Sequence, residues 1–373
     1  MRILQWLNSY LPDTGGIQTF CADLLPELTN RGHEVLILTS HVQKGIPDRT
    51  TVGGIDVCRV HSVEPLMEQD PGGILRAQRA IASIINDFDP DLLHIHPCGP
   101  ELPYYLRVQQ KRPTPTVMTL HNNYSDMTVD FGPTSFFGRT LDHARQIAAV
   151  SEDACRWLLS ERPDLEAKTE PLHNGIPDHA RGAGAPLPWD PPMLTFIGRV
   201  APQKRLDILI KAFAIVAERH PTVRLQVAGD GAELPDIRSL ADSLDLGDRI
   251  DFLGLISPEA VPDLLDTTTL FVMSSDYEGL PIALLEAARQ ARPTVSTDVG
   301  GVREVVLHGE TGLLTERDNP ALLAEAIIEL LEDPARAAQF GAAARDHFGA
   351  SFDLSSCASS YERLYQQATG SAQ

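Results

Sequence analysis

The sequence predicts an α/β protein made of two doubly wound domains in series. Three observations lead to this prediction. The chain has 373 residues, which is more than one ordinary hydrophobic core serves. Short apolar runs alternate with stretches of helical periodicity along most of the chain. This alternation stops over residues 178–192, where small residues and prolines dominate, and then begins again. We therefore expect an N-terminal domain over residues 1–180 and a C-terminal domain over residues 190–355.

The N-terminal domain opens with a strand, a helix and a strand, the order of a βαβ unit. The strand RILQWL ends at Leu7, a Gly-Gly turn follows, and helical periodicity runs from Ile17 to Gly32. Continuous apolar runs are typical of parallel strands that helices cover on both faces. On this basis, further strands are expected at residues 33–40, 91–96, 115–121 and 148–151.

The C-terminal domain repeats this design after the linker. Strands are expected at residues 193–199, 223–231, 250–254, 270–275, 293–298 and 312–316. Helices are expected at residues 204–220, 232–244 and 282–291, with a helical tail from about Pro320. Doubly wound sheets bind ligands at the carboxyl ends of their strands. The residues that follow each strand are therefore the candidates for function.

The composition indicates an acidic, soluble protein of a reducing compartment. The formal net charge of −20 disfavours binding to nucleic acid or to an anionic bilayer through net charge. Five scattered cysteines without a Cys-x-x-Cys motif are typical of a reducing compartment. The N-terminus resembles a first strand rather than a signal peptide, and no apolar run approaches the ~18 residues of a membrane span. We expect a cytoplasmic protein without a transmembrane segment, and peripheral membrane contact stays open.

Two cations flank the loop after the first strand of the C-terminal domain. Gly198 and Arg199 end that strand, and Lys204 lies five residues further on, at the predicted start of a helix. A guanidinium, an ammonium and a helix N-terminus at one loop together favour an anion. The alternative is that both cations are ordinary solvated surface residues. Cations are scarce in this acidic chain, so we favour a diphosphate as the ligand of this pair.

Two glycine-containing loops also follow predicted strands. Gly15 and Gly16 precede the first helix, and Gly229-Asp230-Gly231 follows the second strand of the C-terminal domain. Glycine lets the backbone approach an anion closely at a helix N-terminus. Each loop is equally consistent with a simple turn between a strand and a helix. Neither is a G-x-G-x-x-G or Walker motif.

The segment DYEGLPIALLE places two carboxylates around a predicted helix start. Glu278 lies in the loop after a strand, Pro281 suits a first helical turn, and Glu286 lies about one and a half turns inside the helix. The unpaired amides near Ile282 and Ala283 suit a phosphate. The two carboxylates can accept hydrogen bonds from hydroxyl groups on either side of a diphosphate. A sugar nucleotide has this arrangement of sugar hydroxyls, two phosphates and a ribose diol.

Taken in order, these motifs resemble those of the retaining glycosyltransferases of family 4, which have the GT-B fold. The resemblance covers nearly the whole chain. It implies two Rossmann-like domains that face each other across a cleft, with a C-terminal helix over residues 358–373 that packs back on the first domain. The motifs that carry the resemblance are Gly15-Gly16-Ile17, His173-Asn174-Gly175-Ile176, Gly198-Arg199 with Lys204, Gly229-Asp230-Gly231, and Glu278 with Glu286.

The resemblance implies a role for each matched residue in sugar transfer from a nucleotide diphosphate. Arg199 and Lys204 would hold the diphosphate and neutralise the leaving group, so that no metal or other cofactor is required. Glu278 would contact the sugar hydroxyls, and Glu286 the ribose diol. His121, which ends a predicted strand, would position the donor sugar or stabilise the transition state. Further donor contacts are implied for Gly15, Gly16, Asn174, Gly198, Gly229, Gly279, Leu280, Ile282 and Ala283.

The expected partners are a nucleotide-sugar donor, with a UDP- or GDP-sugar favoured, and a hydroxyl acceptor. The acceptor would be a saccharide, a lipid-linked glycan or a small metabolite. A monomer or a homodimer is expected, and no nucleic acid. One alternative is a sugar-nucleotide epimerase or hydrolase, which would need additional acid and base residues. Another is a non-catalytic sugar-nucleotide-binding protein, which would be expected to lack Arg199, Lys204 or Glu278; all three are present.

His94, His96 and Cys98 raise the question of a metal site at the end of a predicted strand. No further ligand with zinc-type spacing follows, so we expect no metal there and favour contact with an acceptor. Two positions depart from the family pattern. Pro177 follows Asn-Gly-Ile where many relatives have aspartate, and Arg205 follows the lysine where some have glycine. These departures put the hinge and the fine geometry of donor binding in doubt.

Overall fold

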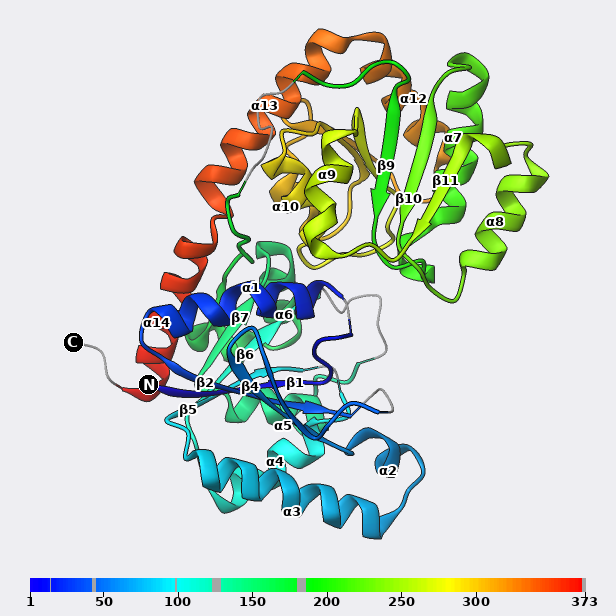
Figure 1. The fold of residues 1–373 in the computed structure, drawn as a ribbon. Helices are drawn as coiled ribbons and strands as arrows, with labels where there is room; N and C mark the ends of the chain where they lie inside the picture. The colour runs from blue at the N-terminus through cyan, green and yellow to red at the C-terminus, as the bar shows by residue number, and fades with distance from the viewer. Residues whose placement is uncertain (14, 42–44, 98, 123–128, 180–185, 371–373) are drawn as a thin grey trace. The chain divides into compact units, whose positions relative to one another are not determined.

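The computed structural model describes residues 1–373 except 14, 42–44, 98, 123–128, 180–185 and 371–373. The chain forms two compact units, each around its own sheet (Figure 1). The first unit combines Met1–Gly175 with Leu354–Gln373, and the second consists of Ile176–Asp353. Both are α/β structures with mainly parallel sheets, which confirms the predicted fold class.

The first unit contains an eight-stranded sheet with β1 and β5 at its centre. The strand order is β3-β4-β2-β1-β5-β6-β7-β8, and β3 and β4 are the antiparallel pair. The chain moves outward from β1 in one direction and from β5 in the other, so the strand order switches between them. The strands are β1 (Arg2–Leu7), β2 (Glu34–Ser40), β3 (Arg49–Val52), β4 (Ile55–Val60), β5 (Leu92–His96), β6 (Thr116–Leu120), β7 (Gln146–Ala149) and β8 (Thr169–Pro171).

Helices cover both faces of this first sheet. Alternate residues of each strand point to opposite faces, so each face has its own set of side chains. Leu4, Trp6 and Ile95 join the apolar core that includes residues of α3, α4 and α5. Gln5 and His94 lie on the other face, where α14 contacts β5 and packs beside α1 (Figure 1). The helices are α1 (Gly16–Asn30), α2 (Val63–Met67), α3 (Pro71–Phe88), α4 (Leu102–Lys111), α5 (Phe136–His143), α6 (Glu152–Glu161) and α14 (Leu354–Thr369).

The second unit contains a six-stranded sheet whose order is β11-β10-β9-β12-β13-β14. All of its strand pairs are parallel. The chain runs from β9 outward to β11 and then returns to start again at β12, so the switch in strand order lies between β9 and β12. The strands are β9 (Met193–Ile197), β10 (Arg224–Ala228), β11 (Ile250–Gly254), β12 (Leu270–Met273), β13 (Thr294–Thr297) and β14 (Gly312–Thr315).

The helices of the second unit form two groups on opposite faces of its sheet (Figure 1). One group packs around α7 and the other around α10. Two helices begin with a side-chain cap followed by proline: Asn319 precedes Pro320, and Asp333 precedes Pro334. The helices are α7 (Leu206–Arg219), α8 (Leu234–Ser243), α9 (Val261–Asp266), α10 (Ile282–Arg289), α11 (Val302–Val305), α12 (Pro320–Glu332) and α13 (Pro334–Ser351).

The helical tail expected from about Pro320 thus consists of three helices, of which α14 belongs to the first unit. Within the described part of the chain, no helix combines the length and the apolar character that spanning a bilayer requires.

Candidate functional site

The strongest candidate site lies at the carboxyl edge of the second sheet, at the switch between β9 and β12. These strands pair in parallel, so both end at the same edge of the sheet. The loops that follow them are residues 198–205 and 274–281. They contain Arg199, Lys204 and Glu278, three of the four predicted catalytic residues. This is the edge at which doubly wound sheets bind ligands.

Backbone hydrogen bonds hold the loop after β9 against the loop after β10. The amide of Gly198 donates to Ala228 O, and that of Val200 donates to Asp230 O, both at 2.9 Å. Gly229 is required by space, because a Cβ there would lie 1.8 Å from Gly198 O. The Gly-Asp-Gly motif therefore supports the loop after β9. The predicted contact of Gly229 with a donor stays a prediction.

Side-chain hydrogen bonds join the loop after β9 to the loop after β12. The amide of Gln203 donates through Nε2 to Tyr277 O at 2.8 Å. The hydroxyl of Ser274 donates to Lys204 O at 2.9 Å and to Arg205 O at 2.8 Å. The backbone that carries the predicted lysine is therefore fixed beside the loop that carries the predicted glutamate.

Lys204 and Glu278 form an ion pair across these two loops, with Nζ 2.5 Å from Oε1. The side chain of Lys204 is 17% exposed and that of Glu278 is 6% exposed. A carboxylate so well removed from water needs a compensating charge. Lys204 supplies that charge, so the two residues act as one unit. The residue pattern assigned them to different parts of a donor and did not predict their pairing.

Arg199 is the cation at this edge that is not neutralised by a carboxylate of the described residues. Its side chain is exposed, whereas Lys204 is paired. Lys204 Cε lies 3.8 Å from the position that a Cβ on Gly198 would take, which brings the lysine close to the start of the arginine's loop. One paired ammonium and one unpaired guanidinium at the same loop can receive an anion. Lys204 ends a short 3₁₀ helix, Pro202–Lys204, and α7 starts two residues after it, later than predicted.

The surroundings of Arg205 explain how an arginine can stand after the lysine, where some relatives have glycine. Its backbone is left-handed, with φ 46° and ψ 46°, a conformation that glycine adopts without strain. The guanidinium donates to Asp207 at 2.9 Å, to Asp276 at 3.1 Å and to Asp318. These hydrogen bonds, with Asp207 first, raise the pKa of Arg205 above its usual range. The ion pairs thus offset a backbone conformation that disfavours a side chain.

Helix α10 starts at Ile282, four residues after Glu278. Pro281 is the N-cap residue, one position earlier than the predicted first turn. Glu286 is the fifth residue of the helix and is partly exposed. The remaining predicted donor-binding residues of this region all lie at or just before the helix start: Gly279, Leu280, Ile282 and Ala283. Their contacts with a phosphate stay predictions.

Gly300 supports this loop in a way that the residue pattern did not reveal. It follows β13 with φ +49°, and a Cβ on it would lie 2.0 Å from Glu278 O. Only glycine combines this backbone conformation with so close an approach. The available signal was the Gly-Gly dipeptide after a predicted strand, the same signal that pointed to Gly15 and Gly16. The absence of a side chain at Gly300 therefore lets the loop after β13 lie directly against the backbone of Glu278.

The predicted donor-binding residues of the first unit lie at several of its loops. Gly15 is the N-cap residue of α1, and Gly16 is the first residue of this helix. The carbonyl of Gly15 accepts from Thr19 N at 2.9 Å. Asn174 is 4% exposed, and its Oδ1 has no hydrogen-bond partner among the described residues. Donor contacts of these three predicted residues stay predictions.

His121 directly follows β6 and belongs to a group of three buried histidines. Its Nε2 lies 2.7 Å from Nδ1 of His96, and the rings of His94 and His96 lie 4.2 Å apart. Burial lowers the pKa of His121 and of His94 to about 3, and that of His96 well below its usual range. All three are therefore neutral at pH 7. His94 and His96 are fully buried, which argues against the expected acceptor contact through their side chains. Cys98 lies outside the described residues.

His41, Asp48 and His61 form a cluster of metal-binding residue types in the first unit that the sequence did not indicate. Their ligand atoms lie within 4.8 Å of one another. His41 and His61 follow β2 and β4, which are neighbours in the sheet. However, their rings are stacked at 4.3 Å with planes 2° apart, so their in-plane lone pairs run side by side instead of converging. His41 Nε2 lies 3.1 Å from Asp48 Oδ1. This geometry supports a hydrogen bond better than a ligand set.

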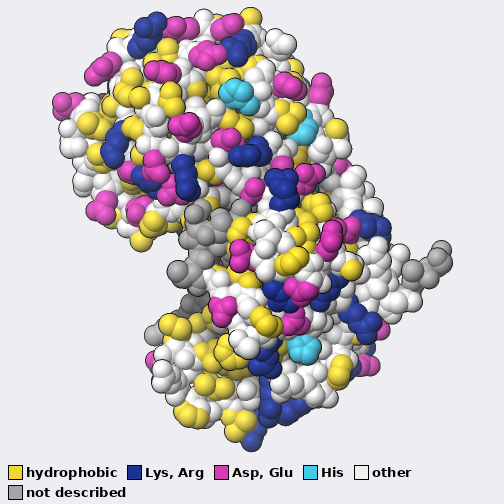
Figure 2. Space-filling model, turned by 180° about the vertical axis from the view of Figure 1, so that it is seen from behind, with side chains coloured by type: hydrophobic (Ala, Val, Ile, Leu, Met, Phe, Trp, Pro, Cys, Tyr) yellow, Lys and Arg dark blue, Asp and Glu magenta, His cyan; other side chains and the backbone are white. Residues whose placement is uncertain are grey.

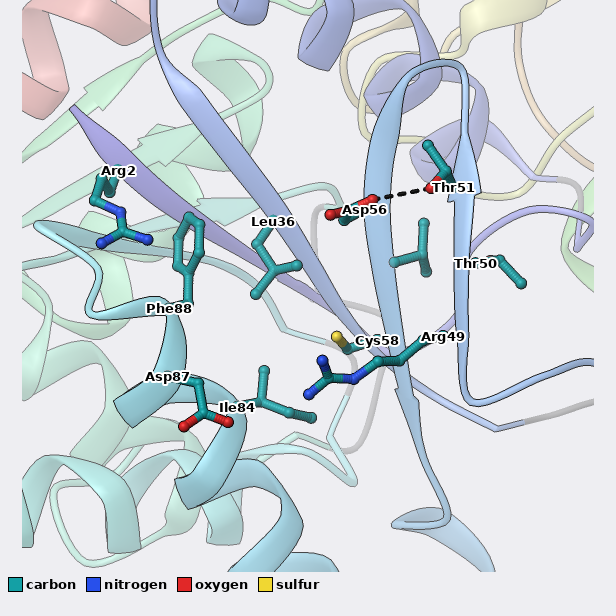
Figure 3. A pocket seen from close by; sticks show the side chains of 11 residues that line it. Arg2, Leu36, Arg49, Thr50, Thr51, Asp56, Cys58, Ile84, Asp87 and Phe88 are labelled. Atoms are coloured by element: carbon teal, nitrogen blue, oxygen red, sulfur yellow. Dashed lines mark hydrogen bonds between the residues drawn. The ribbon is translucent and has the colours of Figure 1, made fainter.

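Two hollows of the first unit lie between α3 and the β3–β4 hairpin. They measure about 370 and 730 Å³ and share Arg49, Cys58 and Ile84. Figure 3 shows the smaller one, in which Thr51 donates to Asp56 at 2.9 Å. Neither hollow is lined by a predicted site residue.

Charged side chains of both signs are interspersed over the face of the molecule that Figure 2 presents. On this face, lysine and arginine are not gathered into the continuous basic stripe that a nucleic acid requires.

Family models match both parts of the chain. The model described as "Glycosyltransferase Family 4" matches residues 14–179, and "Glycosyl transferases group 1" matches residues 184–347. Together the two matches cover the second sheet, the first sheet except β1, and the loops after β9 and β12. The chain belongs to glycosyltransferase family 4. It is therefore a transferase enzyme, as the sequence motifs predict.

This glycosyltransferase is similar to several named proteins. It is 30% identical to alpha-D-kanosaminyltransferase of Streptomyces kanamyceticus over 48% of this chain and 46% of that protein, so this match spans about half of each. It is 27% identical to N-acetyl-alpha-D-glucosaminyl L-malate synthase of Bacillus anthracis over 95% of this chain and 94% of that protein. The structure of Anabaena Alr3699/HepE in complex with UDP-glucose is similar with a TM-score of 0.77, at 20% identity, over 100% of this chain and 99% of that one. At this identity, the likeness shows the GT-B fold.

Proposed function

We propose that this glycosyltransferase moves a sugar from a nucleotide-diphosphate sugar to a hydroxyl acceptor, with retention at the anomeric carbon. A UDP- or GDP-sugar is the proposed donor. The observation that carries the proposal is the Lys204–Glu278 ion pair at the switch between β9 and β12, on the same loop as Arg199, which pairs with no carboxylate of the described residues. The Anabaena structure with UDP-glucose supports a donor of this class.

The charges at this edge fit a diphosphate next to a sugar. Arg199 and Lys204 contribute two positive charges, and Glu278 contributes one negative charge. The eight-residue helix α10 adds unpaired amides at its start. The positive side chains suit the phosphates, whereas the carboxylate suits hydroxyl groups and would repel a phosphate. We therefore propose that a sugar nucleotide binds with its sugar toward Glu278 and its phosphates toward Arg199.

The proposed chemistry depends on stabilising the leaving group. As the bond between the sugar and the diphosphate breaks, negative charge grows on the phosphate oxygen and positive charge grows on the sugar ring. Arg199 and Lys204 stabilise the first of these charges, and interactions that strengthen in the transition state are those that accelerate the reaction. The acceptor hydroxyl loses its proton as it forms the new bond. We propose that a phosphate oxygen of the leaving group takes this proton, and we propose no cofactor.

The proposed acceptor is a hydroxyl compound: a saccharide, a lipid-linked glycan or a small metabolite. The name of the Bacillus anthracis relative includes L-malate, a small hydroxy acid. Malate therefore belongs in the first set of acceptors to be tested, together with monosaccharides.

The donor is tested by thermal unfolding of the protein with a panel of UDP-, GDP- and ADP-sugars. A ligand that binds only the folded state raises the apparent stability. We expect a shift with UDP- or GDP-sugars. The absence of a shift with all members of the panel would contradict the proposal.

Turnover by Arg199→Ala then tests the leaving-group role. We expect turnover to fall about 10²–10³-fold, the range seen when one transition-state donor is removed. Arg219→Ala is a matched control, because Arg219 is also exposed but lies at the end of α7. The configuration of the product, followed by NMR during the reaction, tests retention. Release of free sugar at the same rate without an acceptor would instead indicate a hydrolase.

A further inference from the structure

Five hydrogen-bonding side chains lie together on one face of the first sheet. Gln5 of β1 is in register with His94 of β5, and His96 is two residues further along the same strand. Thr119 is the penultimate residue of β6, and His121 follows it at the same two-residue spacing. All five are less than 9% exposed. Burial of so many polar groups is unfavourable unless each is hydrogen-bonded, so their bonding pattern is informative.

Helix α14 completes this bonding pattern with two tyrosines. The hydroxyl of Tyr365 lies 2.9 Å from His94 Nδ1 and accepts from Gln5 Nε2 at 3.3 Å. The hydroxyl of Tyr361 lies 3.2 Å from Thr119 Oγ1. Burial raises the pKa of both tyrosines, which therefore stay protonated and able to donate. The network thus runs without a break from α14 to the strands of the sheet.

The orientation of the Gln5 side-chain amide determines which ring nitrogens of His96 and His121 carry a proton. Because its Nε2 donates to the tyrosine, its Oε1 is the acceptor that lies 3.0 Å from His96 Nε2. A neutral imidazole has one donor and one acceptor nitrogen. His96 therefore carries its proton on Nε2 and has a lone pair on Nδ1. His121 Nε2, 2.7 Å from that lone pair, must then be the donor.

We propose that Gln5 and His96 are positioning residues that hold His121 as the neutral tautomer with its proton on Nε2, so that His121 Nδ1 accepts a hydrogen bond and does not donate one. The ligand group that matches this nitrogen is a hydroxyl. A phosphate oxygen does not match, because it is a hydrogen-bond acceptor, as Nδ1 is. The assignment of that hydroxyl to a donor or acceptor sugar rests on the proposed function.

The groups around His121 preserve this proton order. Its ring lies 5.0 Å from that of His96 in a stacked arrangement and 6.1 Å from that of Phe20, edge-on. From α1, Cys21 Sγ approaches His96 Nε2 at 3.9 Å. His96, Phe20 and the two tyrosines of α14 carry no charge at neutral pH. Burial lowers the pKa of His121 to about 3, so it stays neutral across the physiological range.

The tautomer of His121 is measured directly by NMR on protein with ¹⁵N-labelled histidine. Correlation of ring protons with ring nitrogens distinguishes a protonated nitrogen from one with a lone pair. We expect a protonated Nε2 and an unprotonated Nδ1 for both His96 and His121, with assignments from single histidine replacements. A proton on Nδ1 of His121 would overturn the proposal.

Variants of Gln5 test the positioning role. Gln5→Met keeps the length of the side chain but removes the acceptor for His96, so we expect a mixture of tautomers at His121. Leu4→Met is the matched control, because Leu4 is the neighbouring buried residue on the apolar face. A wild-type spectrum for Gln5→Met would also overturn the proposal.

Kinetics separate this proposal from the proposed function. We expect Gln5→Met to lower kcat about 10- to 100-fold, since small misplacements of a positioning group have effects of this size. The Kd for UDP or GDP alone should stay at the wild-type value. If the wild-type protein shows the expected tautomer but binds no nucleotide sugar, the proposed function fails and the tautomer assignment stands. If it binds and transfers sugar with the other tautomer, only the positioning proposal fails.

Discussion

Lys204 Nζ lies 2.5 Å from Glu278 Oε1, and this ion pair joins the loop after β9 to the loop after β12. The two residues are 74 positions apart in the chain. Both loops also share backbone contacts through Gln203 and Ser274. The pair is therefore part of the structure before any ligand binds. The ion pair holds the ammonium group in one position, whereas the ammonium of a solvent-exposed lysine occupies many positions.

Removal of the lysine should destabilise the protein through the glutamate that it leaves behind. Lys204→Met leaves a buried carboxylate without its cation, and we expect a loss of about 3 kcal/mol in the free energy of unfolding. Glu278→Gln should have a smaller effect, because Lys204 is more exposed. Chemical denaturation of the second unit measures both values.

The double variant Lys204→Met with Glu278→Gln isolates the interaction. It should be more stable than Lys204→Met alone, because no buried charge is left unpaired. Additive losses in the double variant would show that the ion pair is not formed in solution.

Arg205 is predicted to tolerate glycine better than alanine. Both replacements remove the ion pairs with Asp207, Asp276 and Asp318, but only glycine relieves the left-handed backbone. We expect Arg205→Gly to be more stable than Arg205→Ala by about 1 kcal/mol. Thermal or urea unfolding of the two variants measures the difference. Equal stabilities would show that the backbone at this position relaxes when the side chain is removed.

Gly229→Ala should displace the loop that carries Arg199. The new Cβ would lie 1.8 Å from Gly198 O, so one of the two loops must move. We expect a loss of about 2–4 kcal/mol and reduced turnover. Gly54→Ala is a suitable control, since Gly54 also has a positive φ but has no atom within 4 Å of the added Cβ. A similar loss in both variants would point to backbone conformation and not to crowding.

The buried histidines predict that acid weakens the first unit. The pKa of His94 and of His121 is lowered to about 3 in the folded state, so the unfolded chain binds more protons between that value and its own pKa of about 6.5. Stability is therefore present above pH 6.5 and falls as the pH is lowered through this window. From pH 7 to 5.5 we expect a loss of about 1.3 kcal/mol for each buried histidine.

Urea unfolding at pH 7 and at pH 5.5 measures this loss above the range in which exposed carboxylates titrate. His94→Gln should reduce the difference between the two pH values by the contribution of one histidine. An unchanged difference in this variant would contradict the assignment of the acid sensitivity to the network.

Much of the fold could be predicted from sequence because its signals are local. The continuous apolar runs marked β9 and β12, and the same runs located the loops that carry Arg199 and Glu278. The exceptions are the β3–β4 hairpin and the short strand β8, which were not among the expected strands. Three of the four residues of β3 are polar and all four are at least partly exposed, so this edge strand lacked the apolar run on which the other predictions were based.

The interactions of the site could not be predicted in the same way. The Lys204–Glu278 pair and the contact of His94 with Tyr365 join residues that are far apart in the chain, and no local pattern encodes such partners. From the sequence, His94 was a candidate for binding a metal or an acceptor, because a histidine at the end of a strand can also serve either role. Its role in a buried network became visible only when α14 was seen to contact the sheet.

The division of the first unit between two chain segments has a consequence for biosynthesis. Ribosomes make residues 1–175 first, yet the two tyrosines that seal the polar face of that sheet arrive with residues 354–369. The second unit is continuous in the chain and can therefore fold during translation. Until α14 has been made, the histidines and the glutamine on the polar face of the first sheet stay exposed to water. The helix that completes the first sheet's polar face is thus made after the whole of the second unit.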